Sequence, residues 1–128
     1  MMVSSEGEPF PNVVFPAGCP SRTLMDHVTS KWGLLVLLAL GEGHGAGEPL
    51  RWSELRRRAD GVSEKMLAQT LRILVGDGLV LRDARPVVPP HVEYSLTTSG
   101  RELVGLLNPV MAWVVQNAPA ILEDAATS

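Results

Sequence analysis

Residues 50–78 read LRWSELRRRADGVSEKMLAQTLRILVGDG, and much of the expected architecture follows from them. They predict two helices, over 54–59 and 64–75, because Ser53 and Ser63 precede them and serine is a favoured N-cap residue. A short glycine-containing turn separates the two helices, which is the pattern of a helix-turn-helix. The apolar stripe of the second helix has helical spacing, and its members are Leu67, Leu71 and Leu74.

The segments before this stretch predict two further helices and a very short strand. Proline is favoured at the first helical position, so we expect Cys19 to be the N-cap of a helix that ends near Val28. A second helix, over 31–40, is apolar nearly all round and is therefore expected to be buried. A glycine-rich loop over 41–49 follows, and residues 50–52 predict the strand.

The segments after it predict a hairpin and a last helix. Apolar and polar residues alternate over 91–96, as in a half-buried strand, and a partner strand is expected over 79–83. Three prolines lie between the two strands, and the hairpin forms a wing. Thr97 is expected to cap a helix that covers much of 98–117. The expected fold class is therefore mainly α with a small antiparallel β-wing, a winged helix-turn-helix.

The length of 128 residues fits one domain with a hydrophobic core. We predict a mobile N-terminal arm over 1–18, the winged helix-turn-helix domain with its dimerisation helices over 19–117, and a C-terminal tail over 118–128. The longest apolar run, 32–40, has nine residues, whereas a bilayer span needs about 20. Together with the absence of a secretory leader and the single cysteine, this predicts a cytoplasmic protein that does not bind membranes.

Charge is unevenly distributed along the chain. The formal net charge of −3 argues against histone-like, purely charge-driven binding of nucleic acid. Residues 51–85, however, hold eight basic and five acidic side chains, which gives +3 there and −6 in the remainder. A basic centre in an acidic chain suggests one face that meets a polyanion, and an ordinary solvated surface is the alternative.

The exposed face of the predicted helix over 64–75 carries residues suited to the DNA major groove. Lys65, Gln69 and Arg72 are spaced i, i+4, i+7 and therefore share this face. Lysine and arginine donate to guanine and glutamine pairs with adenine, while Ser63 and the free N–H groups of the first turn can hold a phosphate. We predict that these four residues contact double-stranded DNA. Further candidates, each with a structural role as the alternative, are Arg56, Arg82, Arg85 and His91.

A set of short motifs runs in order from residue 19 to about residue 113. They are Cys19-Pro20, Lys31-Trp32, LRWSEL at 50–55, VSEKML at 62–67, QTLR at 69–72, DGLV at 77–80, VPPHVEYSLT at 88–97, and Gly100. In order and spacing, these motifs resemble those of the HxlR-type winged-helix transcriptional regulators, which are relatives of the MarR group. The resemblance implies a homodimeric bacterial regulator that binds palindromic operators. Because a small dimer on a promoter blocks polymerase by occupying it, we expect a repressor.

Dimerisation also has a local argument, which is the apolar surface of the last helix. It is larger than one small domain can cover, and a two-fold dimer is the usual solution. The resemblance adds that the first and last helices form the interface. The two reading helices then meet half-sites roughly 34–36 Å apart, or a multiple of that helical turn. The residues that we expect in the interface are Leu24, Leu106, Val110, Trp113 and Val114.

Cys19 is a candidate redox sensor. As an N-cap residue it lies at the positive end of a helix dipole, with Arg22 one turn away, and both favour the reactive thiolate. The resemblance adds that several members of the family sense quinones, aldehydes or oxidants with a cysteine at this place. The alternative is a small side chain that packs in the dimer interface. With no second cysteine, oxidation gives a sulfenic acid, an adduct, or a disulfide to another molecule.

The sequence argues against an enzyme. Its three histidines are scattered, and it has no glycine-rich phosphate loop and no Cys/His cluster with metal-ligand spacing, so we expect no catalytic residue, no metal and no cofactor. Two alternatives stay open. One is a regulator of the same fold that responds to a small-molecule effector, bound between the wing base and the dimer helices. The other is a winged helix that serves as a protein-interaction module, in which Lys65, Gln69 and Arg72 would have no use.

Overall fold

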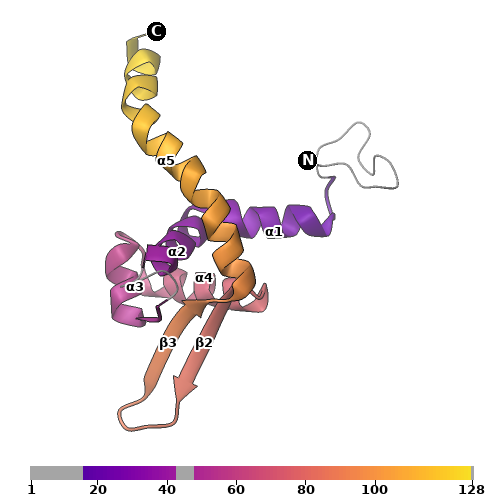
Figure 1. The fold of residues 1–128 in the computed structure, drawn as a ribbon, viewed down its shortest axis with the longest axis vertical. Coiled ribbons are helices and arrows are strands. Elements are labelled where there is room, and N and C mark those ends of the chain that lie inside the picture. The colour runs from indigo at the N-terminus through magenta and orange to yellow at the C-terminus, as the bar shows by residue number, and fades with distance from the viewer. Residues whose placement is uncertain (1–15, 43–47, 128) are drawn as a thin grey trace.

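The computed structural model describes residues 16–42 and 48–127, which form a group of helices and a small sheet whose hairpin projects away from them (Figure 1). Residues 1–15 of the predicted arm and 43–47 of the predicted loop lie outside this part. The order of elements confirms a mainly α protein with a small antiparallel wing. No helix in the described ranges is long and apolar enough to cross a membrane. The elements are α1 (Pro20–Thr29), α2 (Lys31–Glu42), β1 (Leu50–Arg51), α3 (Trp52–Arg58), α4 (Glu64–Gly76), β2 (Val80–Arg85), β3 (His91–Leu96) and α5 (Thr98–Thr127).

Three predicted helix starts are confirmed. The Ser63 hydroxyl oxygen accepts a hydrogen bond from the backbone N–H of Met66 at 3.1 Å and so caps α4. The Thr97 hydroxyl accepts one from the N–H of Gly100, also at 3.1 Å, at the start of α5. Cys19 is the N-cap residue of α1, with proline in the first turn. Such caps matter because the first N–H groups of a helix have no partner within it.

The predicted cap at Ser53 is wrong, because α3 begins earlier. The helix follows β1 directly, and Arg51 is both the last residue of the strand and the N-cap residue of the helix. The Glu54 carboxylate accepts a hydrogen bond from the backbone N–H of Arg51 at 3.5 Å, which favours a helix start at Trp52. Gly61 then turns the chain toward α4 with a φ of +92°, a conformation that glycine adopts at little cost.

The wing consists of β2, β3 and the connection between them. The sheet has the strand order β1-β3-β2, and all neighbours are antiparallel. Val80 pairs with Leu96 at one end of the hairpin and Arg85 with His91 at the other. The predicted strand over 79–83 therefore ended too early, because pairing with β3 continues two residues further.

The core forms around α2, which contacts α1, α3, α4, α5 and β3. This position explains its apolar composition and confirms that the helix is buried. The leucine stripe of α4 is buried against it, as predicted. The largest fully buried side chains are Leu37, Leu40, Leu50, Leu55, Leu67, Leu74, Val36 and Val80.

The last helix is longer than predicted. The prediction covered 98–117, whereas α5 continues to Thr127, so residues 118–127 of the expected tail are helical. Pro109 and Pro119 lie inside the helix without ending it, and the alanines around Pro119 favour helix. Figure 1 shows α5 leaving the body of the domain at the end opposite the wing, while α1 extends to one side.

Candidate nucleic-acid interface

α4 presents a polar face to solvent, opposite the leucine stripe that it buries. This polar face consists of Lys65, Gln69 and Arg72, which are all exposed and lie on one side because of their helical spacing. Within residues 16–42 and 48–127, no side chain forms an ion pair or a hydrogen bond with any of the three. Their donors are therefore available to a partner from outside the chain.

Met66 is an exposed apolar residue of α4 that was not among the predicted contacts. Its side chain is 38% exposed, and it lies next to Lys65 and three positions before Gln69. If the neighbouring polar side chains contact bases, as predicted, an apolar group beside them suits contact with the methyl group of thymine. The sequence does indicate that Met66 is exposed, because this apolar residue falls outside the buried stripe of Leu67, Leu71 and Leu74.

Arg56 forms an ion pair with a residue at the start of α4. Its Nη1 lies 3.4 Å from Oε1 of Glu64, in the first turn of that helix. Both side chains are largely exposed, so the pair contributes little to stability. Ser63 is also exposed, but its oxygen already caps α4, which leaves its hydroxyl hydrogen for an anion. An incoming phosphate therefore meets a neutral ion pair at this end of the helix.

The wing places its basic residues in two different environments. Arg85 lies 3.5 Å from both Asp83 and Glu93, and His91 Nε2 lies 3.0 Å from Oε2 of Glu93. With a neutral histidine, this group of four carries a net charge of −1. Arg82 is exposed and has no carboxylate partner in the described part of the chain. Arg82 is therefore the wing cation that is most available to a phosphate.

The surroundings of Glu93 in this wing cluster favour its charged form. The contact with His91 lowers the pKa of the Glu93 carboxyl, against the opposing effect of burial, and the nearby Arg85 and Arg51 lower that pKa further. The physical cause is that a carboxylate is favoured by a hydrogen-bond donor and by neighbouring positive charge. Arg85 and His91 therefore both lie beside a carboxylate whose charged form is favoured.

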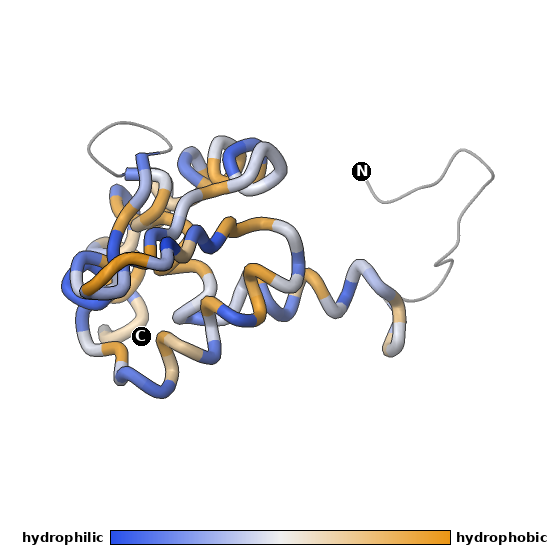
Figure 2. The backbone as a smooth tube through the Cα atoms, turned by 90° about the horizontal axis from the view of Figure 1, so that it is seen from below, coloured by the Kyte–Doolittle hydropathy of each residue, from blue (hydrophilic) through white to orange (hydrophobic). Residues whose placement is uncertain are grey.

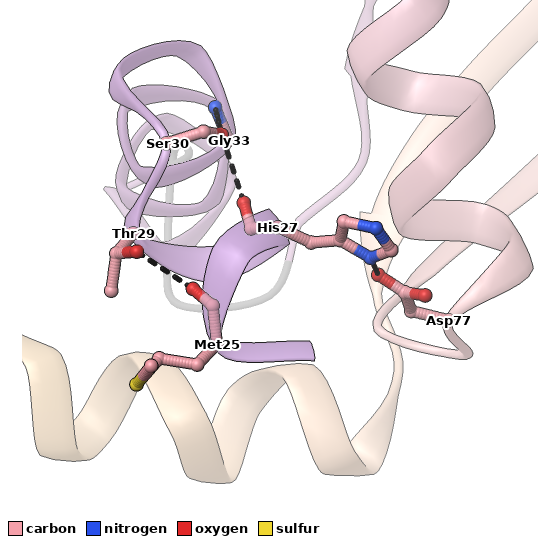
Figure 3. Close-up of polar contacts among 6 residues, drawn as sticks. All are labelled: Met25, His27, Thr29, Ser30, Gly33 and Asp77. Atoms are coloured by element: carbon pink, nitrogen blue, oxygen red, sulfur yellow. Dashed lines mark hydrogen bonds and ion pairs between the residues drawn. The ribbon is translucent and has the colours of Figure 1, made fainter. Parts of the chain in front are cut away.

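A hydrogen bond links α1 to the end of α4. Nδ1 of His27 lies 2.8 Å from Oδ2 of Asp77, the C-cap residue of α4, and both side chains are partly buried (Figure 3). The same end of α1 is closed by Ser30, whose hydroxyl donates to the His27 carbonyl at 2.9 Å and accepts from the Gly33 N–H at 3.2 Å. The helix that follows Cys19 is thus fixed to the helix that carries the polar face.

Cys19 is half-buried at the start of α1. Burial raises the pKa of its thiol, but the backbone N–H groups of Arg22 and Ser21 and the Ser21 hydroxyl outweigh it, so the net pKa lies below its ordinary value. A lower pKa increases the fraction of thiolate, which is the nucleophilic form. In the described ranges, no group of three or more His, Cys, Asp or Glu side chains can hold a metal ion.

The apolar residues expected at a dimer interface are all exposed in the single chain. Leu106 is 72% and Trp113 57% exposed, and large apolar exposure of this kind marks interaction surfaces. Hydrophobic and hydrophilic residues also alternate along α1, next to the grey N-terminal trace in Figure 2. We name this set the α1–α5 apolar surface, and it extends beyond the predicted residues. Its exposed members are Leu24, Met25, Leu106, Val110, Trp113, Val114 and Ile121. Val115 and Leu122 are exposed as well, but by helical spacing they lie on the opposite side of α5.

Comparison with known protein families shows to which family this chain belongs. The model of the HxlR-like helix-turn-helix matches residues 27–121, from the end of α1 into α5. The chain belongs to the HxlR-like helix-turn-helix family. It is a transcriptional regulator, as are the relatives described below, and the family is one of regulators and not of enzymes.

Several relatives of this HxlR-like regulator are similar over most of their length. YtfH of Escherichia coli K12, named as an uncharacterised helix-turn-helix transcriptional regulator, is 50% identical over 109 residues, which are 85% of this chain and 82% of YtfH. The solved structure of the transcriptional regulator YtfH from Salmonella typhimurium is 46% identical, with a TM-score of 0.78 over 89% of this chain and 97% of that one. The oxidised redox regulator HypR is 33% identical, with a TM-score of 0.66 over 77% and 97% of the two chains.

Proposed function

We propose that this HxlR-like regulator binds a palindromic operator in double-stranded DNA as a homodimer and represses transcription by occupying it. The observation that carries the proposal is the polar face of α4, where Lys65, Gln69 and Arg72 are exposed and have free donors. Side chains of these types discriminate guanine and adenine in the major groove. Membership of a helix-turn-helix family of transcriptional regulators supports DNA as the partner.

The residues predicted to contact DNA fall into three groups, according to the partners that their side chains have within the chain. The polar face of α4, with Met66 beside it, contacts bases. Ser63 and Arg82 contact phosphates, because an exposed hydroxyl and an unpaired guanidinium are suited to them. Arg56, Arg85 and His91 each lie beside a carboxylate and must exchange it for a phosphate, so their contribution to affinity is smaller. Because the freed carboxylate attracts a cation from solution, each such contact also adds less to the salt dependence of binding.

The α1–α5 apolar surface supports the homodimer. A second copy that packs Leu106, Val110 and Trp113 against the same surface removes apolar area from water, and a two-fold arrangement is the commonest way to do so. α5 runs away from the wing (Figure 1), so a dimer formed through α5 leaves the wing accessible to DNA.

Cys19 is proposed to make the regulator responsive to electrophiles or oxidants. The lowered pKa of its thiol and its place at a helix start favour attack on an electrophile. One relative is described as a redox regulator, and the contact of His27 with Asp77 provides a path from α1 to α4. The experiment treats reduced protein with benzoquinone, to which the thiolate adds. The parent is expected to lose affinity for DNA, and loss of the same size in Cys19→Ser contradicts the proposal.

DNA binding itself is tested by selection from a random duplex library, with reduced protein and salt near the physiological concentration. We expect an inverted repeat to be enriched. The matched control replaces Lys65, Gln69 and Arg72 together by alanine, which leaves the buried face of α4 unchanged, and it is expected to enrich no sequence. Enrichment of a single, unrepeated site contradicts the dimer. If the parent enriches nothing above background, the exposed face serves a protein partner instead.

A further inference from the structure

A cavity of about 280 Å³ lies between α4 and the wing. Its apolar lining includes Leu71 and Val75 from α4, and two aromatic residues, Trp52 at the start of α3 and Tyr94 on β3, add to it. Tyr94 is otherwise buried, with 8% of its surface exposed. Ligand cavities are typically about 300–1,000 Å³ and mostly apolar, so this one has room for a molecule of about one ring.

Two arginines complete the lining, Arg72 from α4 and Arg82 from β2. No acidic residue lines the cavity, and within the described ranges neither guanidinium has an ion-pair partner. The contrast is Arg85 on the same strand, which lies 3.5 Å from two carboxylates. The cavity therefore combines an apolar body with two uncompensated positive charges.

We propose that this cavity binds a small organic anion, a carboxylate carried on a single-ring apolar body. The ring packs against Trp52, Tyr94 and Leu71, and aromatic side chains favour such contacts. The carboxylate pairs with the guanidinium groups of Arg72 and Arg82, whose planar donors match its geometry. The site differs from the pocket beside the dimer helices that the sequence suggested, because its residues come from α3, α4 and the wing.

Occupation of this cavity competes with DNA, a consequence that rests on the proposed function. Arg72 belongs to the polar face of α4 and Arg82 is a proposed phosphate contact. A carboxylate bound to both occupies the donors that a guanine and a phosphate require. By linkage, an anion that binds only the DNA-free protein weakens the affinity for DNA as its concentration rises. The cavity thus gives the regulator an effector site on its DNA-binding surface.

The first experiment measures binding without DNA. The full-length ¹⁵N-labelled protein is titrated with sodium benzoate at constant ionic strength, and the indole N–H signals of its three tryptophans are followed. We expect saturable movement of the Trp52 signal, with Trp32 and Trp113 as internal references because they do not line the cavity. Benzamide has the same ring without the charge, and inorganic phosphate has charge without the ring. Each is expected to bind at least tenfold more weakly than benzoate.

A pair of variants connects this binding to the two arginines. The double variant Arg72→Gln, Arg82→Gln is expected to weaken benzoate binding at least tenfold. Arg57→Gln is the control, because Arg57 is exposed on α3 and does not line the cavity. Circular dichroism verifies that both variants are folded. The proposal is overturned if the Trp52 signal does not saturate, if benzamide or phosphate binds as well as benzoate, or if the double variant binds benzoate like the parent.

The second experiment measures competition with the operator found by selection, by fluorescence anisotropy at constant ionic strength. Benzoate at ten times its own dissociation constant is expected to raise the apparent Kd for DNA about tenfold, and benzamide at the same concentration is expected to leave it unchanged. Benzoate binding without any effect on DNA affinity overturns the effector role. If the protein binds no operator under any condition, the proposed function fails, and the first experiment still decides the cavity.

Discussion

His27 Nδ1 lies 2.8 Å from Asp77 Oδ2, and this contact joins two residues that are fifty positions apart in the chain. His27 belongs to α1, which begins after Cys19, and Asp77 ends α4, which carries the polar face of Lys65, Gln69 and Arg72. Both side chains are partly buried, with 29% and 18% of their surfaces exposed, so water competes less for the contact than at the surface. The contact therefore connects α1 directly to the C-terminal end of α4.

Replacing Asp77 by alanine removes this contact. We expect the free energy of unfolding to fall by about 0.5–1.5 kcal/mol, the usual net contribution of one hydrogen bond, as measured by urea denaturation. Asp26→Ala is the control, because Asp26 is an exposed acid of α1. If the free energy of unfolding falls equally in the two variants, the contact between Asp77 and His27 does not stabilise the fold.

The two serines of the helix-turn-helix give a second comparison. Ser63 caps α4 through its bond to the Met66 N–H, so Ser63→Ala is expected to lower the free energy of unfolding by about 0.5–2 kcal/mol. Ser53 lies within the first turn of α3 and is not its N-cap residue, so Ser53→Ala is expected to change it by less than about 0.5 kcal/mol. Thermal and urea unfolding of both variants measure the difference, and a larger loss in Ser53→Ala contradicts the assigned helix starts.

Most of the fold follows from local patterns in the sequence, because caps, stripes and strand alternation act over a few residues. The leucine stripe of α4 was predicted correctly as buried, and the alternation over 91–96 predicted the burial of Tyr94 and Leu96, whereas Val92 is only half-buried. Ser53 failed as a cap because the choice between neighbouring starts depends on where β1 ends and where the Glu54 carboxylate reaches. The end of α5 was missed because the prediction stopped the helix before Pro119.

The partners of the charged residues were less predictable, because they depend on distances across the fold. The spacing on α4 predicted that Lys65, Gln69 and Arg72 share an exposed face. Spacing gave no indication that Arg72 and Arg82 line one cavity, since they come from different elements. The charge cluster around Arg85 follows from the register of β2 and β3, in which Asp83 pairs with Glu93 and Arg85 with His91. The register of these two strands could be assigned only from the tertiary structure.

The wing cluster predicts a dependence of stability on pH. The folded-state pKa of Glu93 is lowered from its ordinary value of 4.5, so the unfolded chain binds the proton more tightly than the folded one. The resulting stabilisation is fully present above the ordinary pKa and is lost as the pH falls through the lower folded-state pKa. Glu93→Gln is therefore expected to lose less stability than the parent between about pH 5 and pH 3. Urea midpoints across this range test it, with Glu102→Gln, exposed on α5, as a control that follows the parent.

The α1–α5 apolar surface predicts a change of oligomeric state. Trp113 is 57% exposed in the single chain, and burial of an aromatic side chain in a dimer stabilises it through the apolar area removed from water. Trp113→Glu places a charge in that contact and is expected to give a monomer in sedimentation velocity experiments, whereas Trp113→Phe stays a dimer. Circular dichroism shows whether α5 remains helical. A dimeric Trp113→Glu variant places the interface elsewhere.

The polar face of α4 predicts how sequence is read. Gln69 is exposed without a partner in the described part of the chain, and a glutamine that pairs with adenine contributes about 1–3 kcal/mol of discrimination. Gln69→Ala is therefore expected to weaken operator binding by a factor of about 5 to 150 and to relax the preference at one base position. Arg82→Ala removes a proposed phosphate contact instead, so it should weaken all operator variants alike and lower the slope of affinity against salt. Fluorescence anisotropy on a set of single-base operator variants separates the two patterns. Equal affinities of Gln69→Ala and the parent for every variant remove Gln69 from the residues that read the bases.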